Sequence, residues 1–421
     1  MAEAVLGIDV GTSGVRIAAR GKDGALLAMS SAPINAPLTD GMRRLQDPLL
    51  WWQALRQAFA ALDLKNIRVL ALAVDGTSGS ILAVDGKGEP LTLASMYDDV
   101  VDAEMLKRVA AFAPPETAAL GSTSPLARAL AMDKAAPRIL HQADWIVGRL
   151  SGRFDVTDEN NALKSGYDPV ARHWSAWISE TGFDLRKFPT VVPAGERVGT
   201  ILEDVASQLG LPKDVAVVAG TTDGCAAFLA SGASEAGDGV TSVGTTLTLK
   251  LLSATPVFAP QFGVYSHRIG DQWLAGGASN SGGGVLASLF SRDDIVRLSA
   301  LIDPAVPTGF DYYPLARPGE RFPINDPHFA PRLSPRPKED HVFLQGVLEG
   351  IAAIEAQGYA KLAELGASPL SSIRSVGGGA ANTAWTAIRL RTLKVPARKA
   401  QSEHAAMGTA RLAWRGIGHD A

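Results

Sequence analysis

Apolar runs that end in short turns rich in glycine and hydroxyl side chains recur along the chain. The first 34 residues predict three strands joined by the turns GTSG and GKDG, because short apolar stretches bounded by Gly, Ser and Asp are typical of strands and turns. Residues 69–86 repeat this pattern of an apolar run followed by a glycine-rich turn, as VLALAVDGTSGSILAVDG. Two related stretches follow, VAVVAGTTDG at 215–224 and TSVGTTLTLKLL at 241–252. These related turns predict a duplicated architecture in which several loops face a common cleft.

Helical spacing of apolar residues appears between these strand-like segments. Residues 47–61 predict a helix, with Asp47 as N-cap and a proline at the first helical position. Further helices are expected at 98–113 and 341–365, whereas the proline-rich stretch 312–340 is expected to be largely irregular. Strands precede helices in both halves, which predicts an α/β fold with a substantial parallel component.

Length and composition set the domain organisation and exclude several partners. A chain of 421 residues predicts two domains, placed here at 1–217 and 218–421. The formal net charge of −3 gives no reason to expect nucleic acid as a partner. Cys225 is the single cysteine, which fits a reducing compartment and a role as small buried filler. With neither a signal-peptide pattern nor a membrane-length apolar run, we expect a cytoplasmic protein without a membrane partner.

The glycine-rich turns favour phosphate or nucleotide binding, since backbone N–H groups can approach a phosphate where no Cβ intervenes. The Gly-x-x-x-x-Gly-Lys-[Ser/Thr] pattern is missing, so a P-loop NTPase is excluded. A Gly-x-Gly-x-x-Gly after the first strand is also missing, which disfavours an α/β dehydrogenase. GGGAANTAW at 377–385 and GGASNSGGG at 276–284 can be nucleotide-binding loops or merely tight or flexible turns; beside the other loops, nucleotide binding is favoured.

Three aspartates that follow apolar runs carry the acid–base and metal options: Asp9, Asp75 and Asp223. Phosphoryl transfer to an alcohol needs a carboxylate to take the hydroxyl proton and oxygen ligands for Mg²⁺. The histidines are scattered, which points to hard oxygen chemistry with Mg²⁺. The alternative is that each aspartate caps its own turn; that reading is strongest for Asp75 and weakest for Asp223.

The ordered set of motifs resembles the FGGY carbohydrate kinases, members of the actin-like ATPase group, over nearly the whole chain. LGIDVGTSGVR resembles their first phosphate loop, and DGTSGSILAVDGKGEPL followed by MYDD resembles their second sugar-side segment. VAVVAGTTDGCAAFLASG is similar to the segment with the catalytic aspartate, PGERFPINDPHFAP to a Gly-Glu-Arg-x-Pro region, and SVGGGAANTAW to the adenosine loop. The resemblance implies two ribonuclease-H-like domains flanking a central cleft that holds ATP and sugar, with the sugar on the N-terminal side and the nucleotide on the C-terminal side.

The resemblance also implies roles for individual residues. Asp223 matches the catalytic base, and Asp9 an aspartate close to Mg²⁺, phosphate and sugar. We therefore expect Asp9 and Asp223 at the metal, and Asp9, Asp75, Ser78 and Asp223 at the sugar. The expected ATP-binding residues are Gly11, Thr12 and Ser13 of the first turn, Gly244, Thr245 and Thr246 of the second-half turn, and Gly378, Gly379 and Asn382 of the adenosine loop.

One departure bears on the substrate. The family often has Trp-x-Asp-x-Arg where this chain has Tyr97-Asp98-Asp99-Val100-Val101, so an arginine is missing and modest sugar affinity is expected. Because the sugar-side segments hold carboxylates and hydroxyls but few cations, a neutral sugar is expected rather than a phosphorylated one. The proportions and the GTSG…DGTSG…MYDD set look most like the small ribulokinase- and xylulokinase-like members of cyanobacteria and plants. D-ribulose is then the leading substrate and D-xylulose the next.

Two readings compete with a sugar kinase: a non-catalytic actin-like protein that binds nucleotide or sugar, and a dehydrogenase. The presence of both Asp9 and Asp223 argues against the first, and the missing dinucleotide fingerprint against the second. Either a monomer or a homodimer is compatible with the sequence.

Overall fold

The computed structural model describes residues 1–132 and 134–419, which form two compact units. The first unit contains residues 1–230, 267–270 and 404–419, and the second contains 231–266 and 271–403. The sequence instead placed the division at 217/218. The structure moves it because the segment 218–230 stays with the first unit and the C-terminal segment returns to it.

A sheet of mixed direction forms the centre of the first unit. Its strand order is β14 (Arg197–Thr200), β15 (Ala216–Thr222), β6 (Ile67–Gly76), β1 (Ala2–Val10), β2 (Gly14–Gly21) and β3 (Leu26–Pro33). The strands β1, β6 and β15 run parallel, whereas β2 and β3 are added antiparallel by short turns. The carboxyl ends of the three parallel strands therefore meet at one edge of the sheet.

A smaller antiparallel sheet and several helices complete the first unit. The smaller sheet has the order β4 (Leu38–Asp40), β5 (Arg43–Gln46), β8 (Ala94–Ser95), β7 (Ile81–Val84) and β9 (Arg138–His141). The helices are α1 (Pro48–Ala61), α2 (Ala103–Ala110), α3 (Pro125–Ala131), α4 (Gln142–Ser151), α5 (Glu159–Ala162), α6 (Trp177–Glu180), α7 (Glu203–Leu209), α8 (Asp223–Ala230) and α13 (Ala405–Arg415). Short strands lie between or beside these helices: β10 (Val156–Asp158), β11 (Tyr167–Asp168), β12 (His173–Trp174), β13 (Thr190–Val192) and β18 (His267–Ile269).

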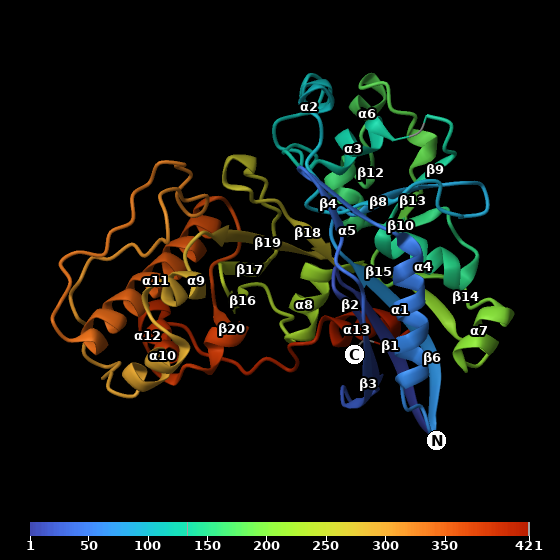
Figure 1. Ribbon diagram of the computed structural model, residues 1–421. Helices are drawn as coiled ribbons and strands as arrows, with labels where there is room; N and C mark the ends of the chain where they lie inside the picture. Colours follow the sequence, from blue (N-terminus) through green and yellow to red (C-terminus); the bar gives the residue numbers. More distant parts are fainter. Residues whose placement is uncertain (133, 420–421) are drawn as a thin grey trace. The chain divides into compact units, whose positions relative to one another are not determined.

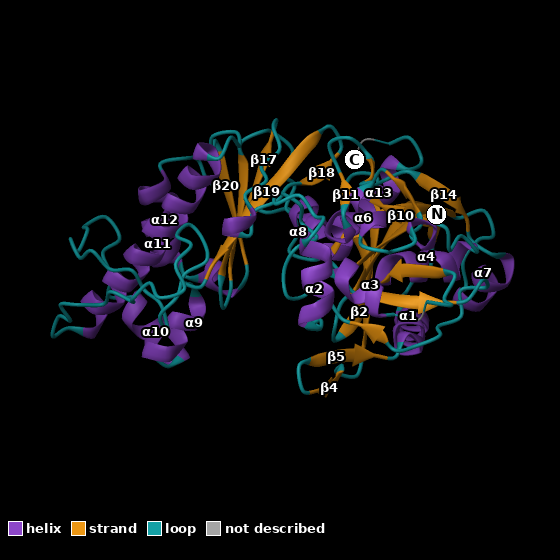
Figure 2. Ribbon diagram, turned by 90° about the horizontal axis from the view of Figure 1, so that it is seen from above, coloured by secondary structure: helices purple, strands orange, loops and turns teal. Residues whose placement is uncertain are grey.

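The second unit repeats the strand plan of the first. Its strands follow the order β19 (Gln272–Ser279), β17 (Leu247–Ser253), β16 (Asp238–Val243) and β20 (Ser372–Val376). β16, β17 and β19 are antiparallel neighbours, and β20 is parallel to β16. The first unit has the same sequence of directions in β1, β2, β3 and β6, which confirms the duplicated architecture that the recurring turns predict. The helices are α9 (Gly283–Leu289), α10 (Arg292–Ser299), α11 (Asp340–Glu364) and α12 (Thr383–Leu393); α11 and α12 pack together beside the strands (Figure 2).

Several sequence-based predictions agree closely with these elements. The Asp47 side chain accepts a hydrogen bond from the Leu49 amide and caps α1, as predicted. The long helix α11 covers 340–364, and the stretch 312–339 contains no helix or extended strand. Cys225 is fully buried. Among the described helices, none combines the length and the apolar character that crossing a membrane requires.

Close backbone contacts hold the C-terminal helix in the first unit. α13, red in Figure 1, packs against β1 and α8. Glycine makes this approach possible: a Cβ at Gly408 would stand 1.9 Å from the Ala226 carbonyl oxygen, and a Cβ at Gly7 would stand 1.8 Å from the Ala406 carbonyl oxygen. Any side chain at either position would force the elements apart.

We predict that Gly408→Ala destabilises the protein by about 2 kcal/mol or more, because overpacking a tight contact outweighs the gain in helix propensity from alanine. Chemical unfolding of the variant measures the effect. The matched control is Gly86→Ala, since nothing lies within 4 Å of a Cβ built at Gly86. A Gly408→Ala variant as stable as the wild type would contradict this packing.

Candidate active site

Three predicted acidic residues converge at the carboxyl edge of the first sheet. Asp9 and Asp75 are direct partners in the parallel pairing of β1 and β6. Asp223 is the first residue of α8, directly after β15, and β15 pairs with β6. The charge of Asp223 acts on the Asp75 carboxyl. The structure therefore brings Asp223 close to two residues that are more than a hundred positions away in the sequence.

Burial gives Asp9 and Asp75 unusual electrostatics. Asp75 is 0% exposed, and burial together with the neighbouring charge of Asp9 raises its pKa well above the ordinary value. Thr409 on α13 donates a hydrogen bond to the Asp75 carboxylate. Burial also raises the pKa of Asp9, although Arg16, whose guanidinium lies 3.2 Å from Asp9 Oδ2, opposes the shift. The pair therefore favours one shared proton over two full charges.

This burial does not fit the expected contact between Asp75 and a sugar hydroxyl. The Asp75 carboxyl instead links strand β6 to helix α13 through Thr409, beside Asp9 on β1, and its Oδ1 atom has no hydrogen-bond partner among the described residues. Ser78, two residues beyond the end of β6, remains a candidate sugar ligand. Its Oγ atom, like Asp75 Oδ1, is buried and has no hydrogen-bond partner among the described residues. Ser78 as a residue is only partly buried, so its hydroxyl is the better placed of the two to meet a ligand.

The GTSG turn between β1 and β2 stands next to Asp9. Gly11 donates from its amide to the Gly14 carbonyl at 3.0 Å, and the Gln46 side chain donates to the Thr12 carbonyl at 3.2 Å. Thr12 is partly buried and Ser13 is exposed. The turn is thus held by its carbonyl groups, and its two hydroxyl side chains can meet an anion.

The sugar-side segment carries more positive charge than the sequence suggested. Arg43 on β5 makes a two-point ion pair with Asp99, at 2.9 and 3.1 Å. Burial alone would raise the pKa of Asp99, but Arg43, the Ser95 hydroxyl and the Arg44 amide together lower it below the ordinary value. Arg43, from a hairpin distant in sequence, thus adds a cation that is already paired with Asp99. Val101, the position of the missing arginine, is buried in an apolar cluster.

Asp98 differs from its neighbour Asp99. Its side chain is 38% exposed, and its Oδ2 atom lies 3.4 Å from the Arg44 guanidinium. The Oδ1 atom has no hydrogen-bond partner among the described residues. Both oxygens of Asp99 already accept hydrogen bonds within the protein. Asp98 keeps one carboxylate oxygen that can accept a hydrogen bond from a ligand.

In the second unit, two predicted phosphate-loop segments lie against each other. The turn Gly244-Thr245-Thr246 joins β16 and β17, and its carbonyl groups accept hydrogen bonds from the amides of Gly283 and Gly284 at 2.8 and 2.9 Å. A Cβ at Gly283 would stand 2.8 Å from the Gly244 carbonyl oxygen. The glycines at 282–284 therefore serve this close contact rather than a flexible loop.

The predicted adenosine-loop residues line a cavity of about 700 Å³ in the second unit. Gly378, Gly379 and Asn382 form one wall, and the apolar side chains of Leu286, Phe290, Ile295, Val296 and Trp385 contribute to the others. Asn382 caps α12 by accepting from the Trp385 amide at 3.0 Å, and it donates to Ser299 of α10 at 2.8 Å. This size and this mostly apolar lining suit a nucleoside base.

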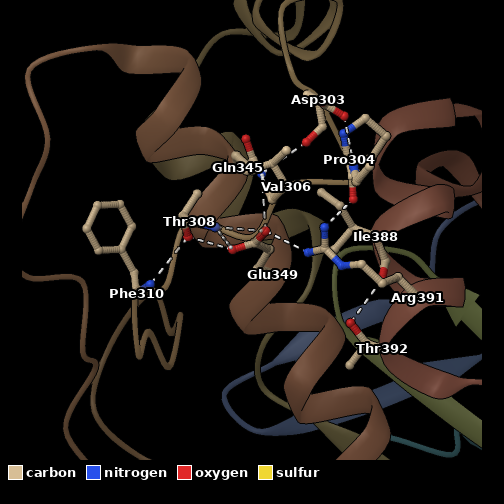
Figure 3. A network of polar contacts seen from close by, with 11 residues as sticks. Asp303, Pro304, Val306, Thr308, Phe310, Gln345, Glu349, Ile388, Arg391 and Thr392 are labelled. Atoms are coloured by element: carbon tan, nitrogen blue, oxygen red, sulfur yellow. Dashed lines mark hydrogen bonds and ion pairs between the residues drawn. The ribbon is translucent and has the colours of Figure 1, made fainter.

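A polar network supports the helices behind this cavity (Figure 3). Glu349 on α11 accepts hydrogen bonds from Thr308, from Gln345 at 3.2 Å and from Arg391 of α12 at 2.7 Å. Arg391 also donates to the Pro304 carbonyl. The network fixes the segment that follows α10 against α11 and α12, and α10 lines the cavity.

The acidic edge can supply part of a magnesium site. No group of three or more His, Cys, Asp and Glu side chains within residues 1–132 and 134–419 is arranged to hold a metal ion. A hard divalent cation that works on nucleotides needs only one or two carboxylates, since phosphates and water complete its shell. Asp9, which is 6% exposed, and Asp223, which is partly buried, fit that requirement; the fully buried Asp75 does not.

A second arrangement resembles a hydrolase triad but is buried. His141 contacts Asp144 at 2.7 Å through Nδ1 and Ser165 at 3.0 Å through Nε2. All three side chains are at most 3% exposed. A nucleophile needs an accessible hydroxyl, so these residues tie α4 to the 163–165 turn rather than act on a substrate.

Comparison with known proteins places the chain in a family. Residues 129–230 match the N-terminal domain of the FGGY family of carbohydrate kinases, and residues 239–417 match the C-terminal domain. The chain belongs to the FGGY family and is an ATP-dependent carbohydrate kinase. Its substrates are accordingly ATP and a small-molecule sugar.

Individual relatives are moderately similar over most of their length. The xylulose kinase of Escherichia coli K12 is 26% identical over 410 residues, which is 90% of this chain and 83% of that protein. The L-fuculokinase of the same organism is 25% identical over 470 residues, which is 99% of this chain and 93% of that protein. The solved structure of a xylulose kinase from Rhodospirillum rubrum superimposes with a TM-score of 0.87 at 22% identity, covering 99% of this chain and 91% of that one. That likeness confirms the two-domain fold of the actin-like ATPase group.

We predict that Asp75→Asn reduces the loss of stability on raising the pH. A carboxyl whose pKa is raised in the folded state keeps its proton there after the unfolded chain has lost it, so stability falls as the pH rises above the ordinary value. Asparagine does not titrate. The free energy of unfolding, measured from about pH 5 to about pH 8, should decline less in Asp75→Asn than in the wild type. Asp214→Asn, at an exposed position, is the control; a wild-type slope in Asp75→Asn would refute the assignment.

Proposed function

We propose that the protein transfers the γ-phosphoryl group of ATP to a hydroxyl of a free ketopentose. The observation that carries this proposal is the convergence of Asp9 and Asp223 at one sheet edge of the first unit. The apolar cavity beside Gly378, Gly379 and Asn382 in the second unit supports binding of the adenosine part. Together these features supply a proton acceptor for the sugar and a holder for the nucleotide.

Asp223 is the proposed general base. Its Oδ1 atom accepts a hydrogen bond from the Gly224 amide at 2.7 Å, which fixes the carboxylate at the start of α8. A carboxylate held in this way can take the proton of the attacking hydroxyl as the oxygen–phosphorus bond forms. Asp9 and the GTSG turn would face the phosphates, and a Mg²⁺ ion held by Asp9 and Asp223 would neutralise phosphate charge.

In the second unit, backbone groups of Gly244, Thr245 and Thr246 are the proposed contacts to phosphate. This turn occupies in the second sheet the place that the GTSG turn occupies in the first, between the first two strands. Glycine-rich turns in such a position present amides without side chains in the way.

A neutral acceptor is the consistent choice, although cations are present on the sugar side. Arg43 is bound to Asp99, and Arg44 lies beside Asp98. Ser78 and Asp98 offer unsatisfied oxygen atoms for hydroxyl groups. D-ribulose is the first candidate, from the motif set of the sequence; the names of the xylulose kinase relatives support D-xylulose as the second.

We predict that Asp223→Asn lowers kcat by about 10²- to 10⁴-fold, because the amide preserves shape but cannot accept the proton. Steady-state assays at saturating ATP and sugar measure the loss. Asp214→Asn, an exposed substitution in the same unit, should leave kcat unchanged. Near-normal turnover by Asp223→Asn would rule out its role as base.

We further predict that free ketopentoses are the best acceptors. Initial rates with D-ribulose, D-xylulose, L-ribulose, L-fuculose and glycerol give kcat/KM for each, and D-ribulose should rank first. A clear preference for another sugar would overturn the D-ribulose assignment. Activity on sugar phosphates alone would overturn the neutral acceptor as well, and ATP binding without transfer to any sugar would favour the non-catalytic alternative.

A further inference from the structure

The guanidinium of Arg128 on α3 joins separate segments of the first unit. Arg128 is 4% exposed. Its Nη1 atom donates to the carbonyl oxygens of Ser95 and Met96 at 2.9 and 2.8 Å, and its Nη2 atom donates to those of Gly79 and Thr123 at 2.5 and 3.1 Å. One side chain therefore satisfies four main-chain carbonyl groups from three loops.

Among the described residues, Arg128 makes no direct ion pair with a carboxylate. Its Nη1 atom also binds the Ser95 hydroxyl at 2.8 Å, and that hydroxyl donates to Asp99 at 2.5 Å. Asp99 in turn is held by Arg43. Burial lowers the pKa of Arg128 to about 10, so the guanidinium remains charged at neutral pH. This relay connects the buried charge on α3 to the hairpin that carries Arg43.

The bound loops are those that present the candidate sugar ligands. Ser78 directly precedes Gly79, and Asp98 lies two residues beyond Met96. Both Ser78 Oγ and Asp98 Oδ1 are buried polar atoms without a partner among the described residues. The amide of Tyr97 donates to Ser80 Oγ at 3.0 Å, which also links the two loops directly. Moving either carbonyl anchor would therefore shift a candidate sugar ligand.

We propose that Arg128 is a positioning residue for the acceptor, which sets sugar affinity by holding the Ser78 loop and the Asp98 loop in one fixed arrangement. The proposal rests on the proposed function, since it takes these loops to be the sugar-binding ones. Arg128 acts through the loops and does not touch the reacting atoms.

The geometry of the side chain matters as much as its charge. A planar guanidinium donates in several fixed directions, whereas a lysine ammonium is a compact charge on a flexible stem. Arg128→Lys keeps the positive charge but leaves only three donors for the four carbonyl groups that the guanidinium holds. A small displacement of the side chains that contact the sugar weakens sugar binding steeply.

The first test is Arg128→Lys. We expect KM for the sugar to rise about 10- to 100-fold, while KM for ATP stays within about twofold, since the nucleoside cavity lies in the other unit. The control is Arg138→Lys on β9, which also loses a guanidinium contact to a carbonyl, that of Phe154 at 3.1 Å, and should change neither constant. A sugar KM at the wild-type value, or an equal rise in both KM values, would overturn the proposal.

The second test uses a cavity of about 670 Å³ that Arg128 lines together with Arg43 and Ser95. Arg128→Ala leaves room there for a small cation. Added guanidinium at millimolar concentration should lower the sugar KM of Arg128→Ala, and an equal concentration of sodium should not. Absence of rescue in a variant whose circular dichroism and melting temperature match the wild type would count against a positioning role.

A reciprocal variant separates this role from general stability. Arg391→Lys weakens the network behind the nucleoside cavity (Figure 3) and should raise KM for ATP rather than for the sugar. If the wild type phosphorylates no sugar, the proposed function fails. If the wild type is active and the Arg128 and Arg391 variants change the same constant, only the inference about Arg128 fails.

Discussion

The buried carboxyl of Asp75 is the contact on which the first unit depends. It lies between Asp9 of the neighbouring strand and Thr409 of the C-terminal helix, and so connects the start of the chain to its end. A fully buried carboxyl is costly unless its proton and both oxygens are accommodated. Thr409 satisfies one oxygen of this carboxyl, whereas Oδ1 has no hydrogen-bond partner among the described residues. The glycine contacts at Gly7 and Gly408 allow α13 to approach closely enough for the Thr409 bond.

The same strand plan serves two kinds of chemistry. In the first unit, the turn after the first strand and the end of the parallel neighbour carry carboxylates and hydroxyls. In the second unit, the corresponding turn is Gly244-Thr245-Thr246, and the loop after the parallel strand β20 is the glycine-rich start of a mostly apolar cavity. The two units therefore share one strand plan. The loop sequences give the first unit an acidic sheet edge and the second unit a cavity suited to a nucleoside.

Much of this could be predicted from local pattern. Strands, the capped helix α1 and the glycine turns depend on residues close in sequence, and so does the order of motifs that marks the family. Contacts between distant segments could not: Arg43 reaches Asp99 over 56 positions and Thr409 reaches Asp75 over 334. The order of elements along the chain also did not predict that the C-terminal helix α13 packs in the first unit. For the same reason the sequence did not reveal that Asp75, expected at the sugar, is fully buried beside Asp9 and Thr409.

We propose that the first unit binds the acceptor sugar and the second unit binds the nucleoside. Amide hydrogen exchange tests it directly, with ADP alone and with the preferred ketopentose alone. ADP should slow exchange around α9, α10 and residues 377–386, whereas the sugar should slow exchange at 76–80, 95–99 and 223–225. Sugar-dependent protection confined to residues 377–386, or ADP-dependent protection confined to 76–99, would contradict it.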